Sequence, residues 1–213
     1  MDNLQDIGER IRGNFEAKYA AREAALRLAR EIIQSSATAI RAIHRSEFPE
    51  ALARIGKARA ALDEAKAALA EHPDIFHAGF IHDAAKEYAE ASLTYAIVLG
   101  QPLPEPEALG VAYASYLNAL GEAAGELRRR LLDQLRHGEV ERCERLLDAM
   151  DDIYSLLVTM DYPDAMTGGL RRTTDVTRGI LERTRGDFTA AARQRDLEVT
   201  LKDFEARVGQ SPS

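Results

Sequence analysis

Apolar residues recur at helical spacing along almost the whole chain, and no stretch shows the sustained alternation of a strand. Ile32, Ile40 and Ile43, for example, fall on one stripe of the first long segment. Glycines at Gly100 and Gly138 stand where two later segments lose this period, as expected for helix C-termini. The pattern predicts an all-α fold of about seven helices, over approximately residues 3–45, 47–71, 75–99, 105–137, 139–160, 170–185 and 186–208.

The connections between these segments are short, which favours a bundle of long antiparallel helices. Ser46 and Asp74 are candidate N-caps, and Gly186 marks a predicted break between the last two helices. The Pro-rich stretch "GQPLPEPE" is too short to be a domain linker. We therefore expect residues 1–213 to form a single helical domain, with a frayed tail at 209–213.

Composition supports a soluble helical protein and adds one clue about partners. Of 213 residues, 46% are hydrophobic and 30% charged, with 7 prolines and no tryptophan. The lone Cys143 cannot form an internal disulfide and is expected to be a packing residue. We see neither a secretory signal nor a membrane-spanning run, so we expect a cytoplasmic protein. The net charge of −7 does not exclude nucleic acid, because arginines cluster locally, at residues 10–12, 22–30, 128–130 and 171–172.

Two pairs of glutamates stand out inside otherwise apolar helices. Glu87 and Glu90 lie three residues apart in "KEYAEA", and Glu122 and Glu126 lie four apart in "LGEAAGELRRR". Both spacings place the two side chains on one helical face, where like charges repel. Either these pairs face solvent, or a cation lies between them.

Glycines precede each glutamate of the second pair, at Gly121 and Gly125. Glycine in a helix costs up to about 1 kcal/mol relative to alanine, so two of them suggest a close approach by another element. Two helices that bring carboxylate pairs together would make an all-oxygen site suited to Mg²⁺ or Mn²⁺. Asp83, in a row with the first pair, could be an outer acid. The simpler alternative is surface charge, for example Glu126 paired with Arg130.

A di-iron centre is not expected, because such bundles use a Glu-x-x-His motif and none of the four glutamates has a histidine three residues on.

Several stretches in order resemble the translin superfamily. "REAALRLAREIIQSSATAIRAIHR" is similar to the first long helix of that family, while "KEYAEA" and "YLNALGEAAGELRR" resemble its translin-associated factor X (Trax) branch. "LLDAMDDIYSLLVTMDYP" and "LRRTTDVTRGILERTRGD" are similar to the last helices of the family, particularly in archaeal and bacterial members. The resemblance extends from about residue 20 to 187.

The resemblance implies seven helices assembled into a closed homo-oligomer, commonly an octamer, around a cavity. Trax-type subunits are metal-dependent endoribonucleases, and translin-type subunits bind nucleic acid without cutting it. The catalytic and metal-binding carboxylates of the Trax branch fall on Glu87, Glu90, Glu122 and Glu126. Glu122 stands where the branch usually has aspartate, which could alter the geometry around Mg²⁺ or Mn²⁺.

The candidate RNA-binding residues are four arginines, of which only Arg129 shares the carboxylate face. Arg129 follows Glu126 by three positions and could hold a phosphate, although it could also be a solvated helix end. Arg22, Arg30 and Arg45 match family positions on the first helix and could follow an RNA backbone. Alternatively, Arg30 or Arg45 could form a buried ion pair between helices. We expect His44 to be a core residue.

Three hypotheses remain from the sequence. The first is a Trax-like endoribonuclease that uses Mg²⁺ or Mn²⁺ to cut single-stranded or flexible RNA. The second is a translin-like shell that binds RNA or single-stranded DNA without catalysis. The third is a helical interaction protein whose acidic pairs are surface features.

Overall fold

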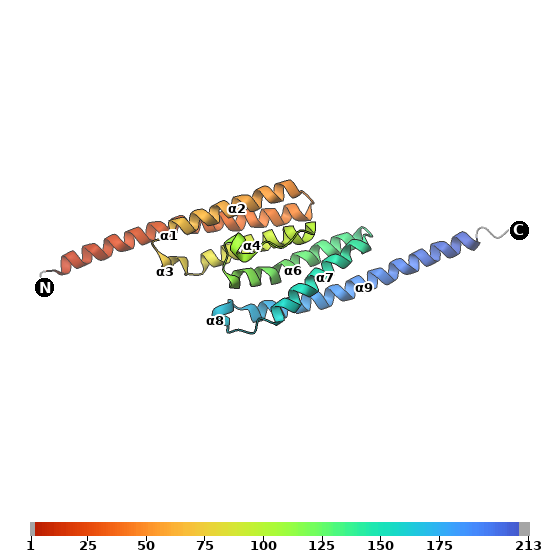
Figure 1. Cartoon of the computed structure of the whole chain (residues 1–213). Coiled ribbons are helices and arrows are strands. Elements are labelled where there is room, and N and C mark those ends of the chain that lie inside the picture. Colours follow the sequence, from red (N-terminus) through yellow and green to blue (C-terminus); the bar gives the residue numbers. More distant parts are fainter. Residues whose placement is uncertain (1–2, 209–213) are drawn as a thin grey trace. The chain divides into compact units, whose positions relative to one another are not determined.

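The computed structural model describes residues 3–208, so the predicted frayed tail at 209–213 lies outside the described residues. Within that range the chain forms nine α-helices and no strand, which confirms the all-α prediction (Figure 1). The helices are α1 (Leu4–His44), α2 (Phe48–Ala68), α3 (Pro73–Phe76), α4 (Phe80–Leu99), α5 (Pro106–Leu109), α6 (Tyr113–Arg136), α7 (Val140–Val158), α8 (Asp164–Thr167) and α9 (Leu170–Val208).

Three of these helices, α3, α5 and α8, are single turns within connections that we expected to belong to longer helices or loops. The predicted N-caps were wrong in both places. Ser46 has a positive φ of 59° and lies in the turn before α2, whose N-cap is Glu47. Asp74 lies within α3, and α4 instead begins after Gly79, at φ 95°. Gly100 ends α4 in the left-handed conformation, as predicted.

The predicted break at Gly186 is also wrong, because α9 runs through it without interruption. A helix can contain glycine at a cost of about 1 kcal/mol when contacts on both sides hold it. Here Arg128 of α6 donates a hydrogen bond to Thr184 (2.9 Å) and pairs with Asp187 (2.7 Å). These contacts hold the turns before and after the glycine.

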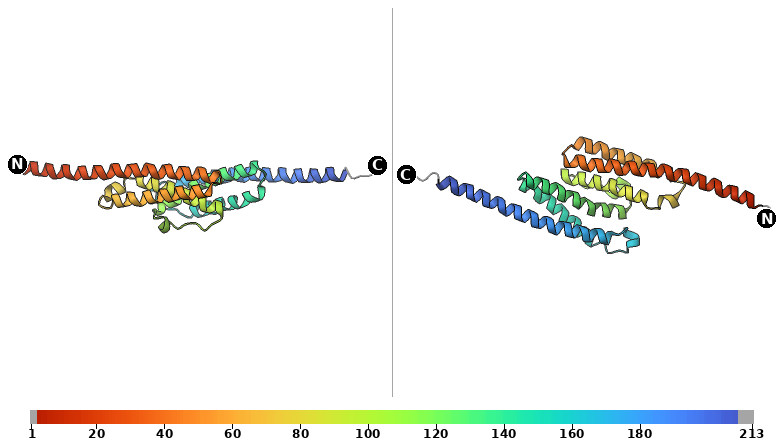
Figure 2. Two further views of the ribbon diagram at one scale, coloured as in Figure 1. Left: turned by 90° about the horizontal axis from the view of Figure 1, so that it is seen from above. Right: turned by 180° about the vertical axis from the view of Figure 1, so that it is seen from behind.

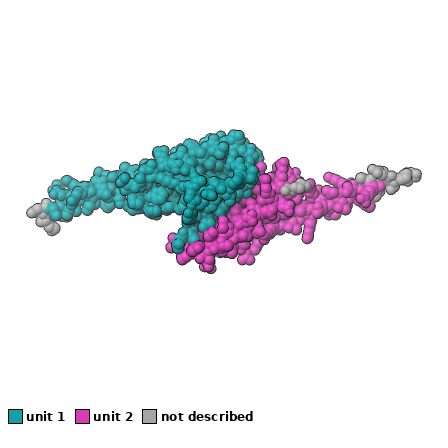
Figure 3. Space-filling view, in the orientation of Figure 1, with its two compact units in different colours: residues 1–120, 166–168 teal, residues 121–165, 169–213 magenta. Residues whose placement is uncertain are grey.

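The chain divides into two compact units, coloured separately in Figure 3. Unit 1 comprises Met1–Leu120 and Met166–Gly168, and unit 2 comprises Gly121–Ala165 and Gly169–Ser213. The short segment returns to unit 1 because the Asn118 side-chain amide donates to the Thr167 carbonyl at 2.8 Å. A single domain over residues 1–213 stays a prediction.

In unit 1, α1, α2 and α4 pack around a shared apolar core, and Figures 1 and 2 show α1 and α2 side by side. Alanine is prominent on their buried faces, which allows the helix axes to approach closely. Larger side chains fill the spaces between them. Among those fully buried are Leu28, Ile32, Ile43, Leu62, Ile81 and Leu93.

In unit 2, α7 packs against α9, and the unit also contains the larger part of α6. Gly121 of α6 has the close neighbours that its sequence position suggested. A Cβ there would lie 2.3 Å from Thr173 Cγ2 and 3.0 Å from Thr177 Oγ1, both on α9. Gly125 is different, since a Cβ there would meet only Ile180 Cδ1 at 3.9 Å. The close approach is therefore to α9 and involves only the first glycine.

Cys143 on α7 is fully buried, as expected of a packing residue, and burial raises the pKa of its thiol to about 11. Because burial disfavours the thiolate, the nucleophilic form is scarce at pH 8. We expect a thiol-reactive probe to label the native protein at least about tenfold more slowly than the urea-unfolded protein at pH 8. Equal labelling rates measured by mass spectrometry would contradict the buried position.

Candidate carboxylate site

Helix α4 carries the first glutamate pair on a half-buried face. Glu87 and Glu90 are both partly exposed, while Tyr88 between them is buried, as expected for a core residue. Burial of Tyr88 fixes the rotation of α4, and the helical period then turns both carboxylates to one side. Lys86 Nζ lies 3.9 Å from the Glu87 carboxylate and partly offsets its charge.

Helix α6 carries the second pair, and contacts within unit 1 set where this helix starts. The connection before it is held by α2, where Arg59 donates to the Ala108 carbonyl at 2.6 Å and Lys66 donates to the Gly110 carbonyl. Arg59 is itself oriented by Asp63, at 2.8 Å. These hydrogen bonds join two carbonyls of the connection to α2, so they help to fix its path.

The first turn of α6 is also joined directly to α4. Ser115 Oγ donates to the His82 carbonyl at 3.2 Å, and Figure 1 shows that α4 and the start of α6 run in the same direction. Glu122 follows Ser115 by seven residues, and Glu90 follows His82 by eight. Both helices advance about 10–12 Å over these spans, so the two glutamates reach the same level.

The structure does bring these side chains together. Glu87, Glu90 and Glu122 each place one carboxylate oxygen within 4.8 Å of the other two, and all three side chains are half-buried. We call these three residues the carboxylate cluster. The fourth predicted ligand, Glu126, lies one turn further along α6, is also half-buried, and is not in this group.

The carboxylate cluster has the chemistry of a site for a hard divalent cation. It presents oxygen atoms only, which suits Mg²⁺ or Mn²⁺ and is unlike the imidazole and thiolate ligands typical of zinc. Three anionic side chains at this separation repel one another, and a cation among them would remove that repulsion. Asp83, proposed from the sequence as an outer acid, is exposed and lies outside the cluster, so its role stays a prediction.

The four candidate RNA-binding arginines are all exposed. Arg22 pairs with its neighbour Glu23 at 2.9 Å, and Arg45 pairs with Glu47 at 2.7 Å. The hydrogen bond to Glu47 raises the pKa of Arg45. Because Arg30 and Arg45 are both exposed, the alternative of a buried ion pair between helices does not hold for either of them. His44, expected in the core, is half-buried at the end of α1.

One aromatic group at the N-terminal end of α4 was missed from the sequence. Three rings form this group, with centroids 5.3–5.8 Å apart. They belong to Phe76 in α3, to His77 directly after α3, and to His82 in α4. The stretch "FHAGFIHD" contains all three residues within seven positions, a signal that periodicity alone does not reveal. A glycine at φ 95° between them turns the chain so that the rings meet.

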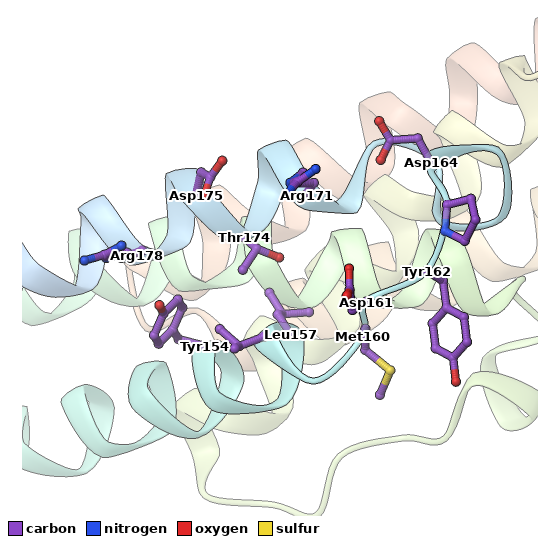
Figure 4. A pocket seen from close by; sticks show the side chains of 12 residues that line it. Tyr154, Leu157, Met160, Asp161, Tyr162, Asp164, Arg171, Thr174, Asp175 and Arg178 are labelled. Atoms are coloured by element: carbon purple, nitrogen blue, oxygen red, sulfur yellow. The ribbon is translucent and has the colours of Figure 1, made fainter.

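A separate pocket of about 700 Å³ lies within unit 2 and contains none of the predicted site residues (Figure 4). Figure 4 shows Tyr154 and Leu157 of α7 across from Thr174 of α9. Arg171 and Arg178 also line it, but three aspartates outnumber them and Arg178 pairs with Glu182 at 2.9 Å. The balance of charge gives this pocket no evident preference for an anion. Its lining residues are Tyr154, Leu157, Val158, Met160, Asp161, Tyr162, Pro163, Asp164, Arg171, Thr174, Asp175 and Arg178.

Within residues 3–208, none of the helices combines the length and apolar character needed to cross a membrane.

Comparison with known proteins identifies relatives along nearly the whole chain, although no family model matches it. The uncharacterized protein MJ0175 of Methanocaldococcus jannaschii is 31% identical over 198 residues, which cover 91% of this chain and 86% of that protein. Two solved structures of AfC3PO, one of them a complex with duplex RNA, are 36% identical and cover 88% of this chain and 97% of theirs. The TM-score is 0.82 for the complex with duplex RNA and 0.83 for the other AfC3PO structure.

The structure of apo-NeC3PO is 20% identical and covers 90% of this chain and 98% of its own, with a TM-score of 0.73, which supports the fold alone. The level of identity to AfC3PO over almost its full length goes beyond a shared fold. This chain therefore belongs to the translin superfamily, as a C3PO-type protein.

Proposed function

We propose that this protein is a Trax-type endoribonuclease that uses Mg²⁺ or Mn²⁺ and works as a closed homo-oligomer. The observation that carries the proposal is the carboxylate cluster, in which oxygens of Glu87, Glu90 and Glu122 lie within 4.8 Å of one another. Acidic groups also gather on protein surfaces without a metal, but these three carboxylates are half-buried and come from two different helices, which supports a bound cation. Glu126, one turn along α6, is the proposed fourth ligand.

In the proposed mechanism the cation acts on the phosphate and on water, and the protein holds the cation. A divalent cation, when bound, would neutralise charge that grows on the phosphate and lower the pKa of a bound water. The glutamates hold the cation through their oxygens. Glu122 keeps the charge of the aspartate usual in the Trax branch but adds one methylene, and its oxygen nevertheless reaches the two glutamates of α4.

RNA is the proposed substrate, supported by the relationship to AfC3PO, whose complex contains duplex RNA. Arg30 and Arg129 are exposed cations available to phosphates. Our sequence-based expectation is a preference for single-stranded or flexible RNA, with single-stranded DNA as a second ligand. Because the AfC3PO complex contains duplex RNA, a test of substrate preference must include both single-stranded and duplex RNA.

A closed homo-oligomer, in the manner of an octamer, is proposed as the working form. Apolar side chains stay exposed at helical spacing at the outer end of α1, on Leu4, Ile11, Phe15 and Tyr19. A similar series occurs late in α9, on Leu197, Leu201 and Phe204. Burying such stripes against further copies of the chain would remove them from water. A monomeric native mass would contradict this part of the proposal.

One assay tests the catalytic proposal. Labelled RNA, single-stranded and duplex, is incubated with the protein in Mn²⁺, in Mg²⁺ or in EDTA, beside a Glu126→Ala variant. We expect cleavage that requires the metal and is lost in the variant, while RNA binding persists. Cleavage that continues in EDTA or is unchanged in the variant would disprove it. RNA binding without cleavage under any condition would instead support a translin-like shell.

A further inference from the structure

The three rings of Phe76, His77 and His82, which we call the histidine platform, form a packed group at the corner between α3 and α4. The Phe76 ring meets each imidazole edge to face, with centroids 5.3 Å apart in both cases. The two imidazoles stack at 5.8 Å with an interplanar angle of 18°. His77 is exposed and the other two rings are partly exposed, so the group presents aromatic surface to solvent.

Contacts around the platform hold it in place. On one side, Lys18 of α1 pairs with Asp74 of α3 at 2.6 Å. On the other, the carbonyl of His82 accepts the hydrogen bond from Ser115. A platform supported from two sides loses little conformational entropy when a ligand binds to it.

The rings of the platform offer aromatic faces to a flat ligand. Burial, followed by the influence of His77, lowers the pKa of His82, while Asp83 acts in the opposite direction. The lowered pKa favours the uncharged form of the His82 ring. Aromatic rings bind nucleobases by stacking, a contact that every base can make with its π-face.

The platform lies at the N-terminal end of α4, before the glutamate pair of that helix. His82 precedes Glu87 by five residues, a rise of about 7.5 Å and a turn of about 140° around the helix axis. Arg22 lies one turn, about 6 Å, beyond Lys18 on the same face of α1, and Lys18 holds that face against α3. Arg22 is an exposed cation that also pairs with Glu23 at 2.9 Å. Cations beside stacked rings are typical of sites that bind single strands.

We propose that the histidine platform is a stacking subsite for an unpaired nucleobase of the RNA, with Arg22 on the neighbouring phosphate. The proposal rests on RNA being the ligand, as in the proposed function, and adds a reason for strand preference. Bases of a duplex are already stacked on one another, so only a single-stranded or flipped base can use the platform.

Binding measurements in EDTA test the subsite without any cleavage. The probes are a uridine octamer and an abasic ribose-phosphate octamer of the same length, which keeps the phosphates but has no bases. We expect His77→Ala to weaken binding of the uridine octamer by about 5- to 150-fold, because stacking on one side chain contributes on the order of 1–3 kcal/mol per base. The abasic octamer should bind wild type and variant equally.

Two further variants sharpen the test. His77→Phe keeps an aromatic ring and should retain most of the affinity, whereas His137→Ala, which removes an exposed histidine from the turn after α6, should have no effect. Arg22→Ala should weaken both octamers and reduce the salt dependence of binding. His77 is exposed, so its replacement should leave the thermal unfolding temperature unchanged.

The outcomes separate the subsite from the nuclease. Equal loss of affinity for both octamers in His77→Ala, or no loss for either, overturns the stacking proposal, even if metal-dependent cleavage is intact. If the wild type binds neither octamer, both the stacking proposal and the RNA-binding part of the proposed function are wrong.

Discussion

Replacement of Glu90 by glutamine is expected to reduce metal-dependent RNA cleavage by about 100-fold or more. Glutamine keeps the size of the side chain and one oxygen but loses the charge that a divalent cation requires. Changes in groups that merely support metal ligands already cost 10–100-fold, so the loss of a direct ligand should cost at least as much. Initial rates in saturating Mn²⁺, with RNA binding measured separately, give the result.

The same variant should lose metal-induced stabilisation. A ligand that binds only the folded state raises the unfolding temperature, so Mn²⁺ should stabilise the wild type and not Glu90→Gln. Glu144→Gln is a matched control, because Glu144 is exposed on α7 and is not in the carboxylate cluster. If Glu90→Gln cleaves RNA at the wild-type rate, or if Mn²⁺ stabilises both variants equally, the carboxylate cluster is not the metal site.

Replacement of Gly121 by alanine should destabilise the protein by about 1–3 kcal/mol, in the range of overpacked cores. The added methyl group would lie 2.3 Å from Thr173 Cγ2, 3.0 Å from Thr177 Oγ1 and 3.3 Å from Leu157 Cδ1. Thr177 also donates to the Gly121 carbonyl at 3.3 Å, so its side chain cannot move away without weakening that bond. The expected fall in unfolding temperature is about 2–12 °C for a chain of this size.

Gly125→Ala provides the matched comparison on the same helix. Its methyl group would meet only Ile180 Cδ1 at an ordinary 3.9 Å, and alanine favours the helix by up to about 1 kcal/mol. We therefore expect this variant to be as stable as the wild type or more so. Similar unfolding temperatures for the two alanine variants would show that packing against α9 does not determine the need for Gly121.

Much of the local structure could be predicted from the sequence because it depends on short-range geometry. The ends of α1 and the glycine cap of α4 follow from helical periodicity and from the conformational freedom of Gly100. The shared face of Glu87 and Glu90 follows from the same period. The predicted break at Gly186 was wrong because the helix there depends on long-range contacts. Arg128 holds it through Thr184 and Asp187, which lie 56 and 59 residues further along the sequence.

The carboxylate cluster shows where sequence information ends. Spacing along one helix places two glutamates on a face, but it cannot say which other helix that face meets. That was decided by long-range hydrogen bonds, from Ser115 to the His82 carbonyl and from Arg59 to the Ala108 carbonyl, which fix where α6 begins. A shift of α6 by one residue would turn its side chains by about 100°, so these contacts determine whether Glu122 reaches α4.

By itself, then, the sequence determined the all-α class, the long helices and the pairing of glutamates within each helix, since these depend on neighbours a few residues apart. Only the tertiary structure decided that Glu122 joins Glu87 and Glu90, that Gly121 packs against α9, and that three rings gather beside α4. The physical reason is that the register between helices depends on contacts between residues far apart in the chain, which no local pattern encodes.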